Sequence, residues 1–394
     1  MRFTWLATIA IVSLGLLPAR AEDAPIRLGV LTDMSSVYAD YGGTGSVEAA
    51  RMAIADSGLG SRVQLRSADT LNKADNAASI ARAWFSGGVD AIFDVPTSGV
   101  ALAVNGEAAR AKKLVFFATA INDRLSEQEC NGYGISWVWD TYSVGRAEAK
   151  ALIEAGKDTW FVITPDGAAG DALEQTARDA AASFGGKVLG SLHHPLNETD
   201  WASYLLQARS SGAKAVLFGS GGADLVNALK QVREFGLPQA GVATGTMYAI
   251  NTDVQGSGLE AMQGLTVVTA FDWNRTDETR AFGRRFFAVH KKMPTMFQAG
   301  VYSAVKQYLL AVQAVGGTDT EKVRAHMLAT PMQDVFLQNG KLLPNGRMLH
   351  DMFLARIKSP AESKEPWDFF NFIGTVPGAE AFRKLADSKC PLLK

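Results

Sequence analysis

The chain has 394 residues, of which 47% are hydrophobic and 20% are charged, a composition typical of globular proteins rather than disordered or fibrous ones. Its 39 Lys and Arg residues nearly balance 40 Asp and Glu residues, so it lacks the basic excess expected of a partner for nucleic acid or anionic lipid. A single hydrophobic core stops growing at about 250 to 300 residues. We therefore expect two lobes.

The first 21 residues have the features of a secretory signal peptide. Arg2 supplies a positive charge, an apolar run extends from Trp5 to Leu17, and Ala19-Arg20-Ala21 matches a cleavage site. The alternative is a membrane anchor, but the run is shorter than the ~20 residues that span a bilayer. Cleavage after Ala21 and export from the cytoplasm are therefore predicted.

Alternating short β-rich runs and helical patterns begin at Ile26, which indicates βαβ units and parallel sheets. The helical patterns show apolar residues three and four apart, as in Val47, Ala50 and Ile54. The strands expected in the first lobe are 26–32, 63–67, 91–95 and 114–118.

A second series of strands begins after residue 140 and predicts a second sheet. Asp200 and Asp224 are placed to cap two of its helices. The chain then forms a long amphipathic helix, residues 301–315, which is expected to cover the first lobe. The strands expected in this part of the chain are 159–164, 187–192, 215–219, 241–244, 265–270, 348–357 and 369–375.

The predicted fold class is α/β, with two doubly wound parallel-sheet lobes joined by a three-strand hinge near residues 140, 271 and 347. After the signal peptide 1–21, the first lobe is expected to comprise 24–140, 272–345 and the C-terminal tail 376–394. The second lobe and the hinge are expected to comprise 141–271 and 346–375.

The two cysteines, Cys130 and Cys390, lie in the part of the chain that would be exported to an oxidising compartment. A disulfide between them is predicted, with two buried free thiols as the alternative. Such a bond would attach the C-terminal tail to the first lobe and contribute on the order of 4 to 5 kcal/mol.

Motifs for catalysis are missing from the sequence, which has no Walker A run, no H-E-x-x-H, no G-x-S-x-G and no C-x-x-C. Adjacent His193 and His194 would point to opposite faces of a strand. No metal and no cofactor are predicted, and the protein is expected not to be an enzyme. The alternative is an exported enzyme that uses Asp166 or Asp272 as a base.

Polar and aromatic residues gather where predicted strands end and helices begin, and ligands of open α/β sheets bind at such places. Helix N-termini there attract a carboxylate through free amides. Three of the four places belong to the first lobe and one to the second, so a ligand would lie between the lobes. These places are 32–41, 96–100, 119–122 and 165–170.

Several stretches of the sequence match a known pattern. They are 26–35 (IRLGVLTDMS), 41–42 (YG), 94–98 (DVPTS) and 299–304 (AGVYSA). Through them the chain resembles the Leu/Ile/Val-binding type of periplasmic substrate-binding protein, the type I family of ABC importers. Residues 345–348 (NGRM), 362–364 (ESK) and the stretch from 381 to 391 resemble the branch that includes aromatic-acid binders.

The resemblance implies reversible capture of a solute by hinge closure, in the periplasm, by a monomer whose partner is an ABC permease in the inner membrane. It also implies site residues. Tyr41 matches a tyrosine near the ligand, and Thr97, next to Ser98, matches the serine that holds the ligand carboxylate. Thr119, Ala120 and Ile121 match a loop that offers backbone groups.

Three positions depart from the amino-acid binders of that family. Ala169 stands where they have an aromatic residue, and Met247 stands where a glutamate pairs with the ligand ammonium. Ile121 likewise replaces a threonine that helps to hold the ammonium. A buried ammonium without an acceptor is costly, so these departures disfavour an amino acid.

The predicted ligand is a small carboxylate, with an aromatic acid favoured. Hydroxyls and amides near Thr97 and Thr119 would take the anion, while Tyr38, Tyr41 and Met247 would cover a ring. Trp139 is expected to pack in the hinge rather than contact the ligand. The alternatives are branched-chain amino acid binding and a sensory module that presents its closed form to a receptor.

Overall fold

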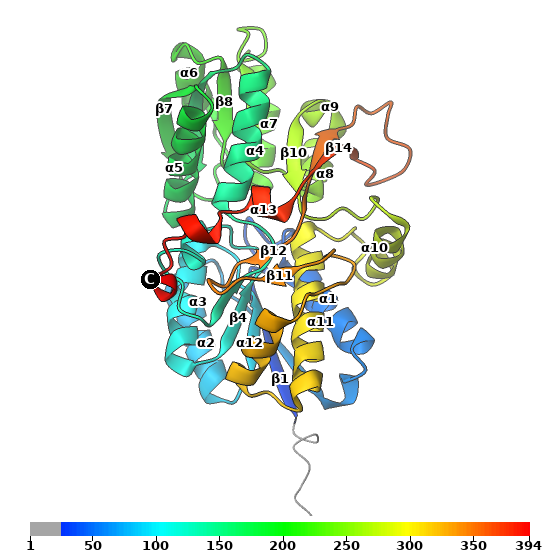
Figure 1. Cartoon of the computed structure of the whole chain (residues 1–394). Helices are drawn as coiled ribbons and strands as arrows, with labels where there is room; N and C mark the ends of the chain where they lie inside the picture. The colour runs from blue at the N-terminus through cyan, green and yellow to red at the C-terminus, as the bar shows by residue number, and fades with distance from the viewer. Residues whose placement is uncertain (1–24) are drawn as a thin grey trace, which may run out of the picture.

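The computed structural model describes residues 25–394, so the predicted signal peptide, residues 1–21, lies outside the described residues. The described chain forms two α/β lobes stacked end to end (Figure 1). Among these residues we find no helix with the length and hydrophobicity needed to cross a membrane.

Lobe 1 is built on a five-stranded parallel sheet with the strand order β2-β1-β3-β4-β5. Its central strands are buried on both faces, which explains their continuous apolar sequences. The strands are β1 (Ile26–Thr32), β2 (Val63–Asp69), β3 (Ala91–Asp94), β4 (Leu114–Phe117) and β5 (Gly134–Ser136). The helices of this lobe are α1 (Gly43–Asp56), α2 (Ala74–Ser86), α3 (Ser98–Ala111), α10 (Asp277–His290), α11 (Met296–Val315) and α12 (Thr320–Ala329).

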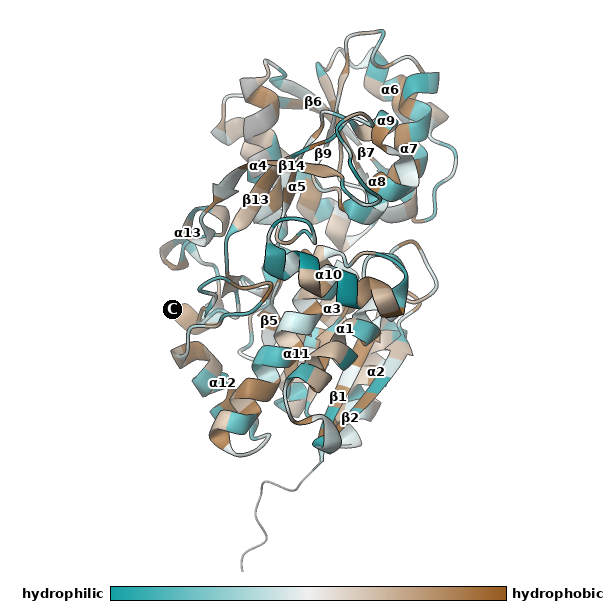
Figure 2. Ribbon diagram, turned by 90° about the vertical axis from the view of Figure 1, so that its right-hand side faces the viewer, coloured by the Kyte–Doolittle hydropathy of each residue, from teal (hydrophilic) through white to brown (hydrophobic). Residues whose placement is uncertain are grey.

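Lobe 2 has a four-stranded parallel sheet with the order β7-β6-β8-β9. Its strands are β6 (Thr159–Pro165), β7 (Lys187–His194), β8 (Ala215–Phe218) and β9 (Ala243–Thr246). Its helices are α4 (Thr141–Glu154), α5 (Ala168–Ser183), α6 (Ala202–Ser210), α7 (Gly222–Glu234), α8 (Asn251–Ser257) and α9 (Leu259–Met262). In the side view of Figure 2, α10, α11 and α12 lie with lobe 1, and α6, α7 and α8 lie with lobe 2.

Two small antiparallel sheets complete the fold. One has the order β10-β13-β14, and the other pairs β11 with β12. Their strands are β10 (Thr266–Thr269), β11 (Lys341–Leu342), β12 (Met348–Leu349), β13 (Met352–Ile357) and β14 (Phe370–Val376). The short elements that remain are α13 (Gly378–Ala381), η2 (Gly60–Arg62), η3 (Asp123–Leu125), η4 (Leu385–Asp387) and η5 (Pro391–Leu393).

The predicted α/β fold with two parallel-sheet lobes is confirmed. The long amphipathic helix also behaves as expected, because α11 is buried along most of its length and packs against α1 and β3 of lobe 1. Several details of the sequence-based prediction are wrong. The strand expected at 265–270 belongs to the antiparallel sheet, and residues 348–357 form two strands. Neither predicted cap is the N-cap residue: Trp201 follows Asp200 in that position at α6, and Asp224 lies inside α7, whose N-cap is Gly221.

The connections between the lobes meet around one buried arginine. Arg347 donates from Nη1 to the carbonyl of Trp139 at 2.8 Å, and the same atom lies 3.6 Å from Asp140 Oδ2. Gly346 accepts a hydrogen bond from the backbone N–H of Ser136 at 2.8 Å. The two connections between the lobes near residues 140 and 347 are therefore held together at the middle of the molecule.

The predicted disulfide is present between Cys130 and Cys390, whose Cα atoms are 5.5 Å apart. The tail that carries Cys390 is also held by Glu127, which accepts from the backbone N–H of Lys389 at 2.5 Å and from Ser388 Oγ at 3.1 Å. The C-terminal tail is thus fixed to lobe 1, as expected.

Candidate ligand-binding site

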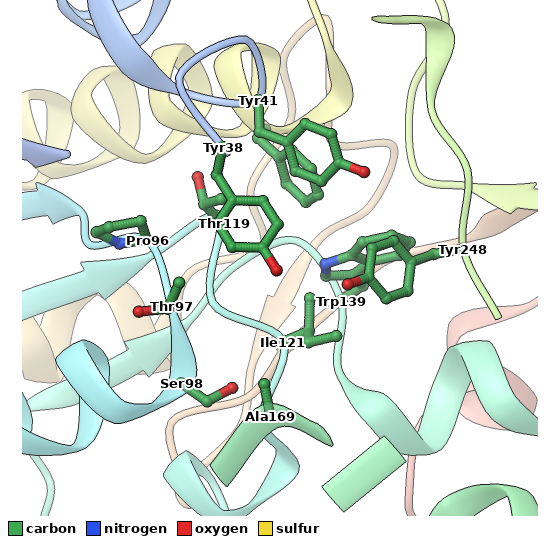
Figure 3. A pocket seen from close by; sticks show the side chains of 11 residues that line it. Tyr38, Tyr41, Pro96, Thr97, Ser98, Thr119, Ile121, Trp139, Ala169 and Tyr248 are labelled. Carbon is green, nitrogen blue, oxygen red and sulfur yellow. The ribbon is translucent and has the colours of Figure 1, made fainter. Parts of the chain in front are cut away.

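A pocket lies between the two lobes, where the carboxyl ends of β3 and β4 face the start of α5 (Figure 3). Eleven residues line it, and seven of the nine predicted ligand-binding residues are among them. These seven are Tyr38, Tyr41, Thr97, Ser98, Thr119, Ile121 and Ala169, and the other four lining residues are Pro96, Trp139, Tyr248 and Phe297.

Ala120 and Met247, the other two predicted residues, do not line the pocket. Ala120 is buried in the core of lobe 1 between two lining residues, since neighbours in an extended segment point to opposite sides. Met247 is buried against α4, with its terminal methyl 3.3 Å from where a Cβ on Gly145 would stand. The next residue, Tyr248, reaches the pocket instead.

The start of α3 supplies hydrogen-bond donors on the lobe 1 side. A turn in which Asp94 and Val95 both have positive φ, 80° and 57°, leads into it, an unusual conformation for residues other than glycine. Thr97 is the N-cap residue, but its side chain makes no capping hydrogen bond. The Ser98 hydroxyl is buried without a partner. Both hydroxyls and the first amides of the helix are available to an anion.

The start of α5 faces them from lobe 2. Gly167, its N-cap, has a φ of 95°, and Gly170 lies so close to Pro165 that an added Cβ would be 1.6 Å from the Pro165 carbonyl oxygen. This tight turn places Ala169 at the edge of the pocket. Asn122 of lobe 1 donates to the Ala168 carbonyl at 3.3 Å. Two helix N-termini therefore approach one pocket from opposite lobes, which favours a negatively charged ligand group.

Thr119 has a different role from the one expected. Its hydroxyl hydrogen bonds to Asp94, a fully buried carboxyl group whose pKa is raised by desolvation, although hydrogen bonds from Thr119 and others oppose that shift. Because this hydrogen bond occupies the hydroxyl, Thr119 supports the strained turn before α3. The donors left for a ligand anion are those around Thr97 and Ser98.

Aromatic rings form the rest of the pocket wall and contact one another in a chain. The ring centroids of Tyr38 and Tyr41 are 5.5 Å apart, and those of Tyr41 and Phe297 are 5.3 Å apart. Trp139 continues the chain, at 5.2 Å from Phe297 and 5.3 Å from Tyr248.

The pocket is small and uncharged. Its cavity volume is about 30 Å³, and one water needs roughly 10 to 15 Å³. None of its eleven lining residues is Asp, Glu, Lys or Arg. Such a site suits a compact, largely apolar molecule whose polar end is satisfied by neutral donors.

Tyr41 also links the two lobes directly. Its hydroxyl donates to Asp253 Oδ2 at 2.7 Å and accepts from the backbone N–H of Gly222 at 2.8 Å, and both partners belong to lobe 2. An added Cβ on Gly222 would lie 2.3 Å from the Val37 carbonyl oxygen. Desolvation raises the pKa of Asp253 to about 7. The lobes are in close contact beside the pocket, as in a closed state.

Comparison with known proteins identifies the family. The family model described as periplasmic binding protein matches residues 25–364. The chain belongs to the periplasmic binding protein family. The predicted resemblance to the type I solute-binding proteins of ABC importers is thereby confirmed. A search of curated proteins finds no match.

Two solved members of the periplasmic binding protein family are similar over nearly the whole chain. A periplasmic binding protein from Burkholderia mallei is 40% identical with a TM-score of 0.91, covering 94% of this chain and 100% of that one. A branched chain amino acid ABC transporter periplasmic ligand-binding protein from Burkholderia xenovorans is 46% identical with a TM-score of 0.83, again over 94% and 100%.

A more distant structure shares the fold of this binding protein. It is a solute binding protein of an R. palustris ABC transporter in complex with benzoate, 20% identical with a TM-score of 0.80, covering 93% of this chain and 100% of that one.

The residues named for other kinds of site lie away from the pocket of this binding protein. His194 hydrogen bonds to Ser220, and His193 pairs with Glu174 at 2.7 Å. Within residues 25–394 no cluster of His, Cys, Asp or Glu has the arrangement of a metal site. Asp166 and Asp272, the alternative catalytic bases, are not among the residues that line the pocket.

Proposed function

We propose that this protein captures a small organic carboxylate, with an aromatic acid favoured, in the periplasm and delivers it to an ABC permease in the inner membrane. The observation that carries the proposal is the composition of the pocket wall. It combines unused hydroxyls at the start of α3 with aromatic rings and has no charged side chain.

This wall favours a carboxylate over an amino acid for an energetic reason. An anion can be satisfied by hydroxyls and by amides at helix N-termini. The α-ammonium of an amino acid needs an acceptor once it leaves water, and an unpaired buried charge costs several kcal/mol. The lining offers no carboxylate for this purpose. Both considerations point to a ligand that has an acid group and no amine.

Aromatic acids are favoured among carboxylates because of the rings around the pocket. Tyr38, Trp139 and Tyr248 would cover an apolar body, and offset or edge-to-face contacts between rings add to simple burial. Structures with the same fold include R. palustris proteins in complex with 4-hydroxybenzoate and with benzoate.

Branched-chain amino acid binding is the second candidate. It is favoured by the Burkholderia xenovorans relative, which is 46% identical and carries that description. The two candidates differ in one chemical group, the ammonium, and this allows a direct test.

The test is isothermal titration calorimetry on the purified mature chain with matched ligands. Leucine and 4-methylpentanoate have the same carbon skeleton apart from the ammonium, and benzoate and cyclohexanecarboxylate differ in aromaticity. We expect 4-methylpentanoate to bind more tightly than leucine, and benzoate more tightly than cyclohexanecarboxylate. Tightest binding of leucine or valine would establish the second candidate instead.

Export is tested separately by N-terminal sequencing of the protein from the periplasmic fraction. Cleavage after Ala21 predicts a mature chain that begins at Glu22. A chain that retains residues 1–21 in the membrane fraction would contradict the proposed location.

A further inference from the structure

Trp139 differs from the other buried tryptophans in how its indole N–H is bonded. Residues 25–394 contain five fully buried tryptophans. In four of them the N–H donates to a protein oxygen: Trp137 to Ser303, Trp160 to Lys157, Trp201 to Glu198 and Trp273 to Trp367. The N–H of Trp139 is equally buried and has no acceptor within the described chain. Leaving a buried donor unpaired is costly, so this atom calls for an explanation.

The surroundings of Trp139 hold its ring in one orientation. Tyr248 and Phe297 contact it edge to face at 5.3 Å and 5.2 Å. Its backbone carbonyl accepts from Arg347 Nη1 at 2.8 Å, which fixes the chain at the start of the hinge. The indole nitrogen is turned toward the interior of the pocket (Figure 3). The unpaired N–H is therefore directed at the space where a ligand would lie.

An indole N–H can be satisfied only by an acceptor. Its edge carries positive partial charge, so it repels an ammonium and attracts an oxygen lone pair. Figure 3 shows Trp139 across the pocket from Thr97 and Ser98, the residues that would take the carboxylate. The acceptor must then be a second oxygen, carried by the far end of the ligand.

We propose that Trp139 is a specificity-determining residue that donates its indole N–H to a hydroxyl or carbonyl oxygen on the ring of the bound aromatic acid. This inference rests on the proposed function and narrows the ligand class to aromatic carboxylates with an oxygen substituent opposite the acid group. Tyr38 and Tyr248, whose rings line the same region, complete the polar end of the pocket.

The experiment measures dissociation constants by calorimetry for benzoate, 4-methylbenzoate and 4-hydroxybenzoate. A methyl group matches the size of a hydroxyl but cannot accept a hydrogen bond. For the unmodified mature chain we expect 4-hydroxybenzoate to bind about tenfold or more tightly than 4-methylbenzoate, because only the hydroxyl pairs with the buried N–H. In Trp139→Phe this preference is expected to fall to about twofold or less. Because Trp139 lines the pocket, the ratio of the two affinities within this variant is the readout, and not its affinity for benzoate. Trp137→Phe is the matched control and should keep the preference.

A measurement on the unmodified chain keeps the test independent of whether Trp139→Phe folds. With ¹⁵N-labelled tryptophan, the indole N–H resonance of Trp139 should shift strongly when 4-hydroxybenzoate is added and much less with 4-methylbenzoate. The resonance is assigned on the unmodified chain from its nuclear Overhauser contacts with the rings of Tyr248 and Phe297.

The possible failures are distinguishable. Equal affinities for the hydroxyl and methyl compounds, or a preference that survives in Trp139→Phe, would overturn the role of Trp139 and leave the proposed function standing. Absence of binding by every aromatic acid would overturn both. Tightest binding of trimethylglycine would show that the rings form a cage for a quaternary ammonium by cation–π contacts, which also overturns the inference.

Discussion

Thr97 is the residue that most directly tests how the ligand anion is held. Its side chain makes no capping hydrogen bond, so removing the hydroxyl leaves α3 intact. A hydrogen bond to a charged group contributes about 1.5 to 3 kcal/mol, and Thr97→Ala should therefore weaken benzoate binding by roughly 10- to 100-fold, as measured by calorimetry. Thr318→Ala, in the turn after α11, is the matched control and should not change affinity. Equal affinity of Thr97→Ala and the unmodified chain would remove Thr97 from the site.

The buried carboxyl group of Asp253 is expected to make closure of the two lobes depend on pH. Burial in the closed state raises its pKa to about 7 from an ordinary value of 3.8, and closure therefore takes up a proton when the pH lies between these values. The stabilisation of the closed form is fully present below the lower value and is lost as the pH rises through about 7. Tyr41 donates to this carboxyl group, and Asp40 adds a like charge nearby.

Benzoate affinity should consequently be higher at pH 6 than at pH 8, by calorimetry in buffers of different ionisation enthalpy. In Asp253→Asn the dependence should disappear, because the new side chain does not titrate in this range. If benzoate affinity still depends on pH in Asp253→Asn, the dependence arises from another titrating group.

At the residue scale, the sequence identified the lobe 1 side of the pocket better than the lobe 2 side. Thr97 and Ser98 follow a strand and begin a helix, a signal that sequence carries. The family resemblance predicts Met247, but its neighbour Tyr248 lines the pocket instead, because a shift of one residue along an extended segment reverses the direction of the side chain. Phe297 lies early in α11 and has no local signal that separates a pocket ring from a core ring.

At the scale of elements, the hinge depends on the buried pair of Arg347 and Asp140. Burial lowers the pKa of Arg347 to about 10 and raises the pKa of Asp140, so each group relies on the other to remain charged. Arg347→Ala would leave Asp140 buried and unpaired. Removing one partner of such a pair costs about 3 to 5 kcal/mol, which urea denaturation of the ligand-free protein should show. The control Arg356→Ala breaks an exposed pair with Glu362 and should have little effect. An unchanged midpoint in Arg347→Ala would contradict this account of the hinge.

The elements themselves were largely predictable because their hydrophobic patterns are regular. β1 has the expected bounds, Ile26–Thr32, and α11 buries the stripe that its sequence shows. The missed strand β5 has only three residues, Gly134–Ser136, too few for a period to be detected. The sequence places β10 in the wrong sheet because its partner β13 (Met352–Ile357) comes much later in the chain, and local sequence does not encode such pairing.

At the scale of the whole molecule, the disulfide between Cys130 and Cys390 connects residues 260 positions apart. A cross-link over so long a loop stabilises mainly by restricting the unfolded chain, by about 5 kcal/mol. Replacement of both cysteines by serine should therefore lower the denaturation midpoint and leave it insensitive to reductant. The unmodified chain should lose a similar amount of stability when reduced. No change on reduction would show that Glu127 and its contacts suffice to hold the tail.

The central claim is that the two lobes close on a small carboxylate, and small-angle X-ray scattering of the mature chain tests it most directly. We predict that 4-hydroxybenzoate reduces the radius of gyration of the unmodified chain, since the contacts of Tyr41 with Asp253 and Gly222 form only when the lobes meet. Thr97→Ala at the same ligand concentration should remain extended. A scattering profile that stays the same with every aromatic carboxylate, or that contracts with leucine alone, would contradict the account.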